Sequence, residues 1–272
     1  MSFFMLTVNR VSGQNSDVLT LFLYPYVPDI ERFKSAITEE WGRHHPDIRL
    51  EYSDWDCYSG ILPENVDVFV YDTVYFDQYL KQGLLLPLSK ADIKDIDDFF
   101  PFAIEASTTG ETIYTENNSP YIFGEWFTDG VGRAFIGFSE AMSVMGDSTD
   151  EIDFHLYSMT EEPNIPLFYM DAASVNANIS QEKRALAIEL LNLITGTDIL
   201  VRASSPNEPD QSHQYLLSAR KSFYDIMEKK DPIYTELQTF VSSPDNHIFS
   251  ARNEDLAALY DTSLITSLLT EN

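Results

Sequence analysis

The sequence predicts an α/β fold in which helices pack against a mixed or parallel sheet. Between residues 18 and 88, short apolar runs and amphipathic segments follow one another in the order strand, helix, strand, strand, helix. This order is typical of sheets whose neighbouring strands run parallel and are joined by helices. The chain has 272 residues, 44% of them hydrophobic and 13% aromatic, which is enough for a substantial core.

The first predicted strand and helix are bounded by clear signals. Residues 18–24 form an apolar run that Pro25 ends. Asp29 is a suitable N-cap for a helix over residues 30–41. The apolar side chains of this helix fall on one stripe, as expected for packing on a sheet. They are Phe33, Ile37 and Trp41.

Two further strands and a helix complete this part of the chain. Apolar and polar residues alternate over 48–52, which indicates a strand with one covered face, and 66–71 is a more apolar strand. Residues 75–82 are expected to form a helix that stops at Gly83. The polar, turn-rich stretch 108–120 then indicates a connector.

An apolar run in the middle of the chain provides a candidate site. Residues 133–138 are rich in Ala, Phe and Ile, which predicts a strand buried on both faces, and 121–127 is expected to lead into it as a short helix. Glu140 follows this strand at its carboxyl end, where open α/β sheets bind their ligands. The alternative interpretation is a loop glutamate beside a core strand.

The rest of the chain is predicted to be mainly helical. Residues 165–171 bring a tyrosine and an aspartate to a bend, and 174–176 continue in an extended conformation. Four helices are expected after this point. They span residues 180–195, 216–228, 234–241 and 254–269.

The charge balance restricts the partners. Lys and Arg number 17 against 44 Asp and Glu, for a formal net charge of -27. Such a surface repels phosphate backbones and anionic lipid, so we expect neither nucleic-acid nor membrane binding. It attracts a cationic ligand, although the same excess also serves solubility.

Cysteine and histidine usage argues against several other functions. Cys57 is the sole cysteine, so no intramolecular disulfide or thiolate metal cluster is expected, and the five histidines lack metal-site spacing. We therefore expect no metal and no cofactor. The apolar run 3–8 is too short to span a bilayer and does not make a complete signal peptide. The expectation is a cytoplasmic protein, or a secreted one given without its leader.

Several collinear stretches together resemble the bacterial thiamine pyridinylases (thiaminase I). The resemblance extends from about residue 19 to about residue 249 and includes motifs such as Leu-Tyr-Pro-Tyr-Val-Pro-Asp and Asp-Trp-Asp-Cys-Tyr-Ser. The stretches are residues 23–29, 54–59, 66–72, 132–140, 165–171, 214–220 and 232–234.

The resemblance implies a two-domain fold of the periplasmic-binding-protein type II. Residues 18–110 and 172–272 would then form the main lobe, and 111–171 a reduced second lobe. Residues 1–17 would be an N-terminal extension.

The resemblance also implies a cleft whose aromatic and acidic side chains hold the aminopyrimidine of thiamine. Glu140 falls on the family's general base, which activates a cysteine nucleophile, and Phe138 replaces a tyrosine that the family usually has. Tyrosine faces stack on the pyrimidine, and carboxylates accept hydrogen bonds from its amine. The substrate-binding residues implied by position are Tyr24, Tyr58, Asp72, Tyr121, Tyr169 and Asp171.

One departure from the family concerns the nucleophile. The family's cysteine segment follows a Gly-Glu-x-Tyr motif, and residues 110–114 here read Gly-Glu-Thr-Ile-Tyr. Residues 115–121 already match much later family sequence, so the segment that would carry the nucleophile is absent. Cys57 lies next to Tyr58 and is either a replacement nucleophile or a small half-buried thiol.

Three functions therefore remain open. The first is binding of thiamine or a related aminopyrimidine, with catalysis lost or displaced, as in a pseudoenzyme. The second is an enzyme of altered chemistry that uses Glu140 and Asp171 as an acid/base pair. The third is a non-catalytic interaction module, with a protein partner or a second copy of the chain covering the place of the missing segment.

Overall fold

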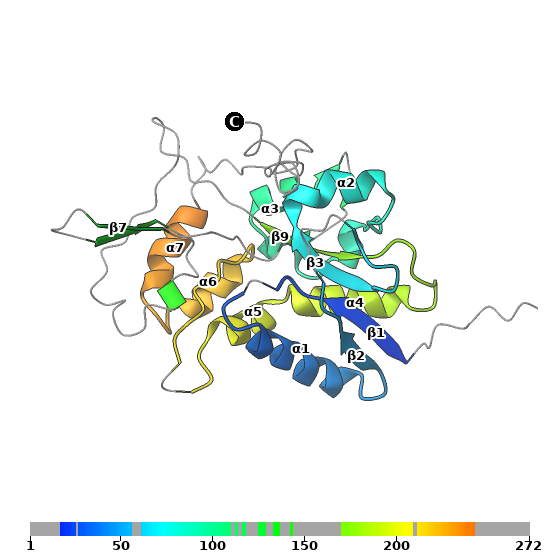
Figure 1. Cartoon of the computed structure of the whole chain (residues 1–272), viewed down its shortest axis with the longest axis horizontal. Coiled ribbons are helices and arrows are strands. Elements are labelled where there is room, and N and C mark those ends of the chain that lie inside the picture. The colour runs from blue at the N-terminus through cyan, green and yellow to red at the C-terminus, as the bar shows by residue number, and fades with distance from the viewer. Residues whose placement is uncertain are drawn as a thin grey trace, which may run out of the picture.

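The computed structural model describes residues 17–25, 27–55, 61–109, 112–113, 116–117, 125–128, 133–136, 142–143, 170–208 and 211–242. Its centre is a five-stranded mixed sheet in the order β2-β1-β3-β9-β6 (Figure 1). β1 runs parallel to β2 and β3, whereas β9 is antiparallel to both β3 and β6. The strands are β1 (Val18–Phe22), β2 (Arg49–Tyr52), β3 (Val68–Asp72), β6 (Glu116–Asn117) and β9 (Asp171–Val175). This confirms the predicted α/β class with a mixed sheet.

Helices cover both faces of this sheet (Figure 1). A short 3-10 turn, Thr73–Tyr75, joins β3 to α2. The α-helices are α1 (Ile30–His44), α2 (Phe76–Lys81), α3 (Pro101–Ala106), α4 (Arg184–Ile194), α5 (Thr197–Ser204), α6 (Lys221–Met227) and α7 (Ile233–Val241). The predicted helix 254–269 lies outside the described residues.

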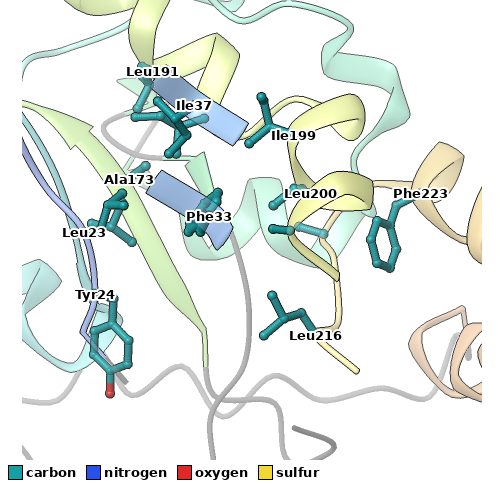
Figure 2. Packing of buried hydrophobic residues seen from close by; sticks show 14 of the residues in the cluster. Leu23, Tyr24, Phe33, Ile37, Ala173, Leu191, Ile199, Leu200, Leu216 and Phe223 are labelled. Atoms are coloured by element: carbon teal, nitrogen blue, oxygen red, sulfur yellow. The ribbon is translucent and has the colours of Figure 1, made fainter. Parts of the chain in front are cut away.

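β3 shows why the sheet is buried on both faces. Val68 and Val70 belong to the larger apolar cluster, which the sheet forms with α1, α4 and α5, and part of which is drawn in Figure 2. Phe69 and Tyr71 belong to a second cluster together with α2. Because successive strand residues point to opposite faces, the alternation in cluster membership follows directly from the sequence of β3.

α1 begins and packs as predicted. The Asp29 carboxylate accepts a hydrogen bond from the backbone N–H of Arg32 at 3.0 Å, which caps the first turn. The expected stripe of Phe33, Ile37 and Trp41 is buried in the larger cluster. The helix therefore presents one apolar face to the sheet and its charged face to solvent.

One prediction about the middle of the chain is wrong. Residues Glu125–Thr128 form a strand, β7, where a short helix was expected. β8 (Arg133–Ile136) pairs antiparallel with β7 in a separate two-stranded sheet, and not in the central sheet. The sequence between them, which includes Asp129-Gly130, has the residue types that hairpin turns favour. A second short hairpin joins β4 (Thr108–Thr109) to β5 (Thr112–Ile113).

The helices after β9 also differ in detail from the prediction. α5 was not predicted, and α6 begins at Lys221 instead of at residue 216. Tyr215, just before the predicted start of this helix, has a φ of 51°, in the left-handed region. The division into a main lobe and a second lobe, at residues 110 and 171, stays a prediction. β6 falls within the predicted second lobe, residues 111–171, but lies in the central sheet.

Candidate functional site

Three of the predicted site residues meet at one edge of the central sheet. β3 ends at Asp72, and β9 begins there with Asp171, its direct partner in the register. β1 runs parallel to β3, with Phe22 opposite Phe69, so that Tyr24 follows β1 at the same edge. This edge holds the carboxyl ends of the parallel strands, where ligands of open α/β folds bind.

The chain leaves and re-enters the central sheet at this same edge. Asn117, the last residue of β6, is paired with Ala172 of β9. The segment between β6 and β9 therefore starts and finishes beside Asp171. Whatever it forms is attached at the edge that carries the candidate site.

Asp72 and Asp171 are both buried, at 4% and 3% exposure. Directly opposed residues of an antiparallel pair point to the same face of the sheet, where like charges repel. By the same alternation they share the face of Val70 and Ala173, which is the face covered by α1, α4 and α5.

Local hydrogen bonds fix the orientation of Asp72. Its Oδ1 accepts from the backbone N–H of Val74 at 2.9 Å and so caps the 3-10 turn after β3. The backbone N–H of Thr73 donates to the carbonyl of Met170 at 3.0 Å, which holds the end of β3 against the start of β9. The Asp72 carboxylate is thus oriented by the backbone, next to the start of β9.

A small pocket opens beside Tyr24 and Asp171, which both line it. Figure 2 shows the ring of Tyr24 next to Leu23, with its hydroxyl directed away from the other labelled side chains. Asp72 does not line the pocket. The remaining lining residues are Val27, Phe33, Val70, Leu200, Ser204, Leu216, Leu217, Ser218 and Phe223.

The other predicted site residues cannot be placed. Tyr58, Tyr121, Tyr169 and the candidate base Glu140 lie outside the described residues. Cys57 lies outside them as well. The structure therefore brings Tyr24, Asp72 and Asp171 together, and the roles of the others stay predictions.

Sequence reasoning missed the part of the pocket that α5 supplies. Leu200 and Ser204 lie on this helix and line the pocket opposite the sheet. The signals for α5 are present in the sequence: an acidic residue, Asp198, in the first turn, and buried Ile199, Leu200 and Ala203 with helical spacing.

Within the ranges that the structure describes, no three His, Cys, Asp or Glu side chains are grouped as a metal site would require. The described helices include none with the length and apolar character needed to cross a bilayer.

Similarity to solved structures identifies the class of the fold. The GacH receptor of Streptomyces glaucescens, solved without ligand and with acarbose, matches with a TM-score of 0.68 at 10% identity, over 92% of this chain and 94% of that chain. The fold is that of the periplasmic binding proteins, as the sequence resemblance implied.

Matches at higher sequence identity are to thiaminase I proteins. Residues 100–160 match the Thiaminase-1 domain model. Thiaminase-1 of Paenibacillus thiaminolyticus is 27% identical over 348 residues, covering 88% of this chain and 85% of that protein. Thiaminase I of Clostridium botulinum, solved in complex with thiamin, matches with a TM-score of 0.78 at 25% identity, over 90% of this chain and 99% of that chain. The chain is similar to thiaminase I over most of its length, and the resemblance seen in its sequence is confirmed.

Proposed function

We propose that this chain binds thiamine or a related 4-aminopyrimidine at the edge formed by β1, β3 and β9, without transferring the pyrimidine to a nucleophile. The observation that carries the proposal is the pairing of Asp72 with Asp171 at the strand ends, beside Tyr24. The thiaminase I of Clostridium botulinum, which shares the fold, was solved in complex with thiamin.

The chemistry of the three residues suits such a ligand. A carboxylate accepts hydrogen bonds from an exocyclic amine or pairs with a protonated ring nitrogen. The ring of Tyr24 offers a face for stacking. Thiamine also carries a positive charge on its thiazolium, which the net charge of -27 favours.

Pyrimidine transfer is not expected, because the chain lacks the cysteine segment that the family resemblance implies. Displacement of the thiazolium needs a thiolate that adds to the pyrimidine ring. Cys57 is the sole cysteine and does not lie in a Pro-Gln-x-x-Cys-Thr-Asn-like segment, which the family resemblance implies for the nucleophile. The alignment with the Paenibacillus protein is longer than this whole chain, which supports a loss of internal sequence. Glu140 then has no thiol at the expected place to deprotonate.

Thermal unfolding with and without thiamine tests the binding. Thiamine at a hundredfold excess over its Kd should stabilise the chain by about 2.7 kcal/mol, or about 5 °C in the unfolding midpoint. Thiamine consumption, with aniline or pyridine as acceptor, should stay at the uncatalysed rate. An unchanged midpoint at saturating thiamine contradicts the binding, and consumption that Cys57→Ser abolishes contradicts the absence of transfer.

A further inference from the structure

The segment between β1 and α1 carries Tyr24 into the candidate site. It leaves the sheet after Phe22 and ends at Asp29, which caps α1. Two prolines, Pro25 and Pro28, fix the φ angle at their own positions and so reduce the number of conformations that this short segment can adopt. The place of the Tyr24 ring therefore depends on how the Asp29 end of the segment is held.

One buried side chain, that of Gln214, holds this end. Its Oε1 accepts from the backbone N–H of Asp29 at 2.7 Å, and its Nε2 donates to the Asp29 carbonyl at 3.4 Å. Nε2 also donates to the carbonyl of Ala203, in α5, at 2.6 Å. Gln214 is only 1% exposed, so water does not take part in this link between Asp29 and α5.

The carboxyl end of α5 is tied to the start of α1 by further hydrogen bonds. The last carbonyls of a helix have no partner within the helix itself. The carbonyl of Ala203 accepts from the Gln214 side chain, and that of Ser204 accepts from the Gln214 backbone N–H at 2.9 Å. The carbonyl of Ser205 accepts from Nη1 of Arg32, in the first turn of α1, at 3.0 Å. The two helices, which lie side by side (Figure 1), are thus joined at these ends.

Gln214 connects three parts of the candidate site without lining the pocket. Tyr24, Leu200 of α5 and Leu216 all line it. Figure 2 shows Tyr24 on one side and the two leucines on the other. Gln214 is not among the lining residues, so it can influence a ligand only through the residues that it holds.

We propose that Gln214 is a positioning residue for thiamine binding. By holding Asp29 against the end of α5, it fixes the ring of Tyr24 beside Asp171. This inference rests on the proposed function. An amide suits the role because its hydrogen bonds are directional, whereas an apolar side chain of the same length would fill the space and leave the segment free to shift.

The test is calorimetric titration of thiamine into the full chain and its variants, with folding checked first by circular dichroism. Gln214→Met keeps the length of the side chain and removes its hydrogen bonds. It should bind thiamine about fivefold more weakly, which corresponds to the loss of one aromatic stacking contact. If Gln214→Met does not fold, Gln214→Glu takes its place with the same expected loss. It keeps an acceptor for Asp29, but its carboxylate cannot donate to Ala203.

Asn176→Leu is the matched control, because Asn176 is also buried and its amide also joins two segments. Its Nδ2 donates to the carbonyl of Val66 at 3.0 Å, and its Oδ1 accepts from the backbone N–H of Asn178 at 2.9 Å. Asn176 follows β9 at its carboxyl end, whereas Asp171 begins this strand. Asn176→Leu should lose stability in urea, as Gln214→Met does, but should bind thiamine within about twofold of the wild type.

The outcomes separate the positioning role from the proposed function. If the wild type binds thiamine and Gln214→Met binds it equally well, or if Asn176→Leu loses as much affinity, the positioning role is overturned and the proposed function stands. If the wild type does not bind thiamine, both are overturned.

A double-mutant cycle tests whether Gln214 acts through Tyr24. If it does, its replacement should have no further effect once the tyrosine ring is gone. Tyr24→Ala and the double variant Tyr24→Ala/Gln214→Met should therefore bind thiamine with affinities within about twofold of each other. A further loss of about fivefold in the double variant would show that Gln214 acts independently of Tyr24, and would overturn the proposal.

Discussion

Asp72 and Asp171 occupy directly opposite positions in the antiparallel pair of β3 and β9. Two buried carboxylates placed in this way oppose folding unless a positive charge or donor groups compensate them. The pairing is the feature on which the proposed binding site at this edge of the central sheet rests.

Asp72 has a structural role that can be separated from its charge. Asn at this position keeps an oxygen for the backbone N–H of Val74, whereas Ala removes the cap. We expect Asp72→Asn to unfold in urea at nearly the wild-type free energy and Asp72→Ala to lose about 1 kcal/mol relative to it. Equal stability of the two variants would show that the cap contributes nothing.

The buried ion pair of Asp67 and Lys183, 2.8 Å apart, lies within the core of the fold. Asp67 also accepts from the backbone N–H of Thr20 at 2.9 Å. Replacing Lys183 by Met leaves an uncompensated buried carboxylate, which should cost about 3–5 kcal/mol in the free energy of unfolding. The double variant Asp67→Asn/Lys183→Met keeps an acceptor for Thr20 and should be more stable than Lys183→Met alone. A double variant as unstable as the single one contradicts this.

Replacement by alanine should change the stability of the chain in opposite directions at two glycines. Gly42 lies inside α1 with open space around it, so Gly42→Ala should stabilise the chain by about 0.5–1 kcal/mol. Gly83 also has open space, but its φ is +69°, so Gly83→Ala should destabilise it by about 1 kcal/mol. Urea unfolding of both variants checks the pair, and effects of the same sign would contradict the backbone argument.

His213 should make stability depend on pH. Burial lowers its pKa below the ordinary value, and the nearby cations Lys230 and Arg32 act in the same direction, while Asp231 opposes them. The unfolded chain then takes up a proton at higher pH than the folded chain, so this contribution to stability is present above the ordinary histidine pKa and is lost as pH falls through it. His213→Gln should show a shallower fall in unfolding free energy between pH 7 and pH 5 than the wild type, as measured by urea unfolding. An identical slope contradicts a role for His213.

The sequence predicted the elements whose signals are local. The apolar runs of β1 and β3 and the stripe of α1 are periodic, and Asp29 caps α1 as its residue type suggests. The strand β7 was mistaken for a helix, because a run of four residues is too short for periodicity to distinguish the two.

The candidate site was predictable only in part. The sequence placed Asp72 at a strand end and Asp171 at a bend, and the family resemblance suggested that both bind the ligand. Their direct pairing depends on the antiparallel return of β9, which no local pattern shows. Ser204 was missed because its place in the pocket depends on how α5 packs over the sheet.

The most direct test of the proposed site is calorimetric titration of thiamine into the wild type, Asp171→Asn and Asp225→Asn. Asp225 is exposed on α6, so its variant controls for the loss of one negative charge. The wild type and Asp225→Asn should bind thiamine alike, and Asp171→Asn should bind at least about tenfold more weakly, because a charge-assisted hydrogen bond is lost. Equal binding by all three proteins, or no binding by the wild type, would contradict the site.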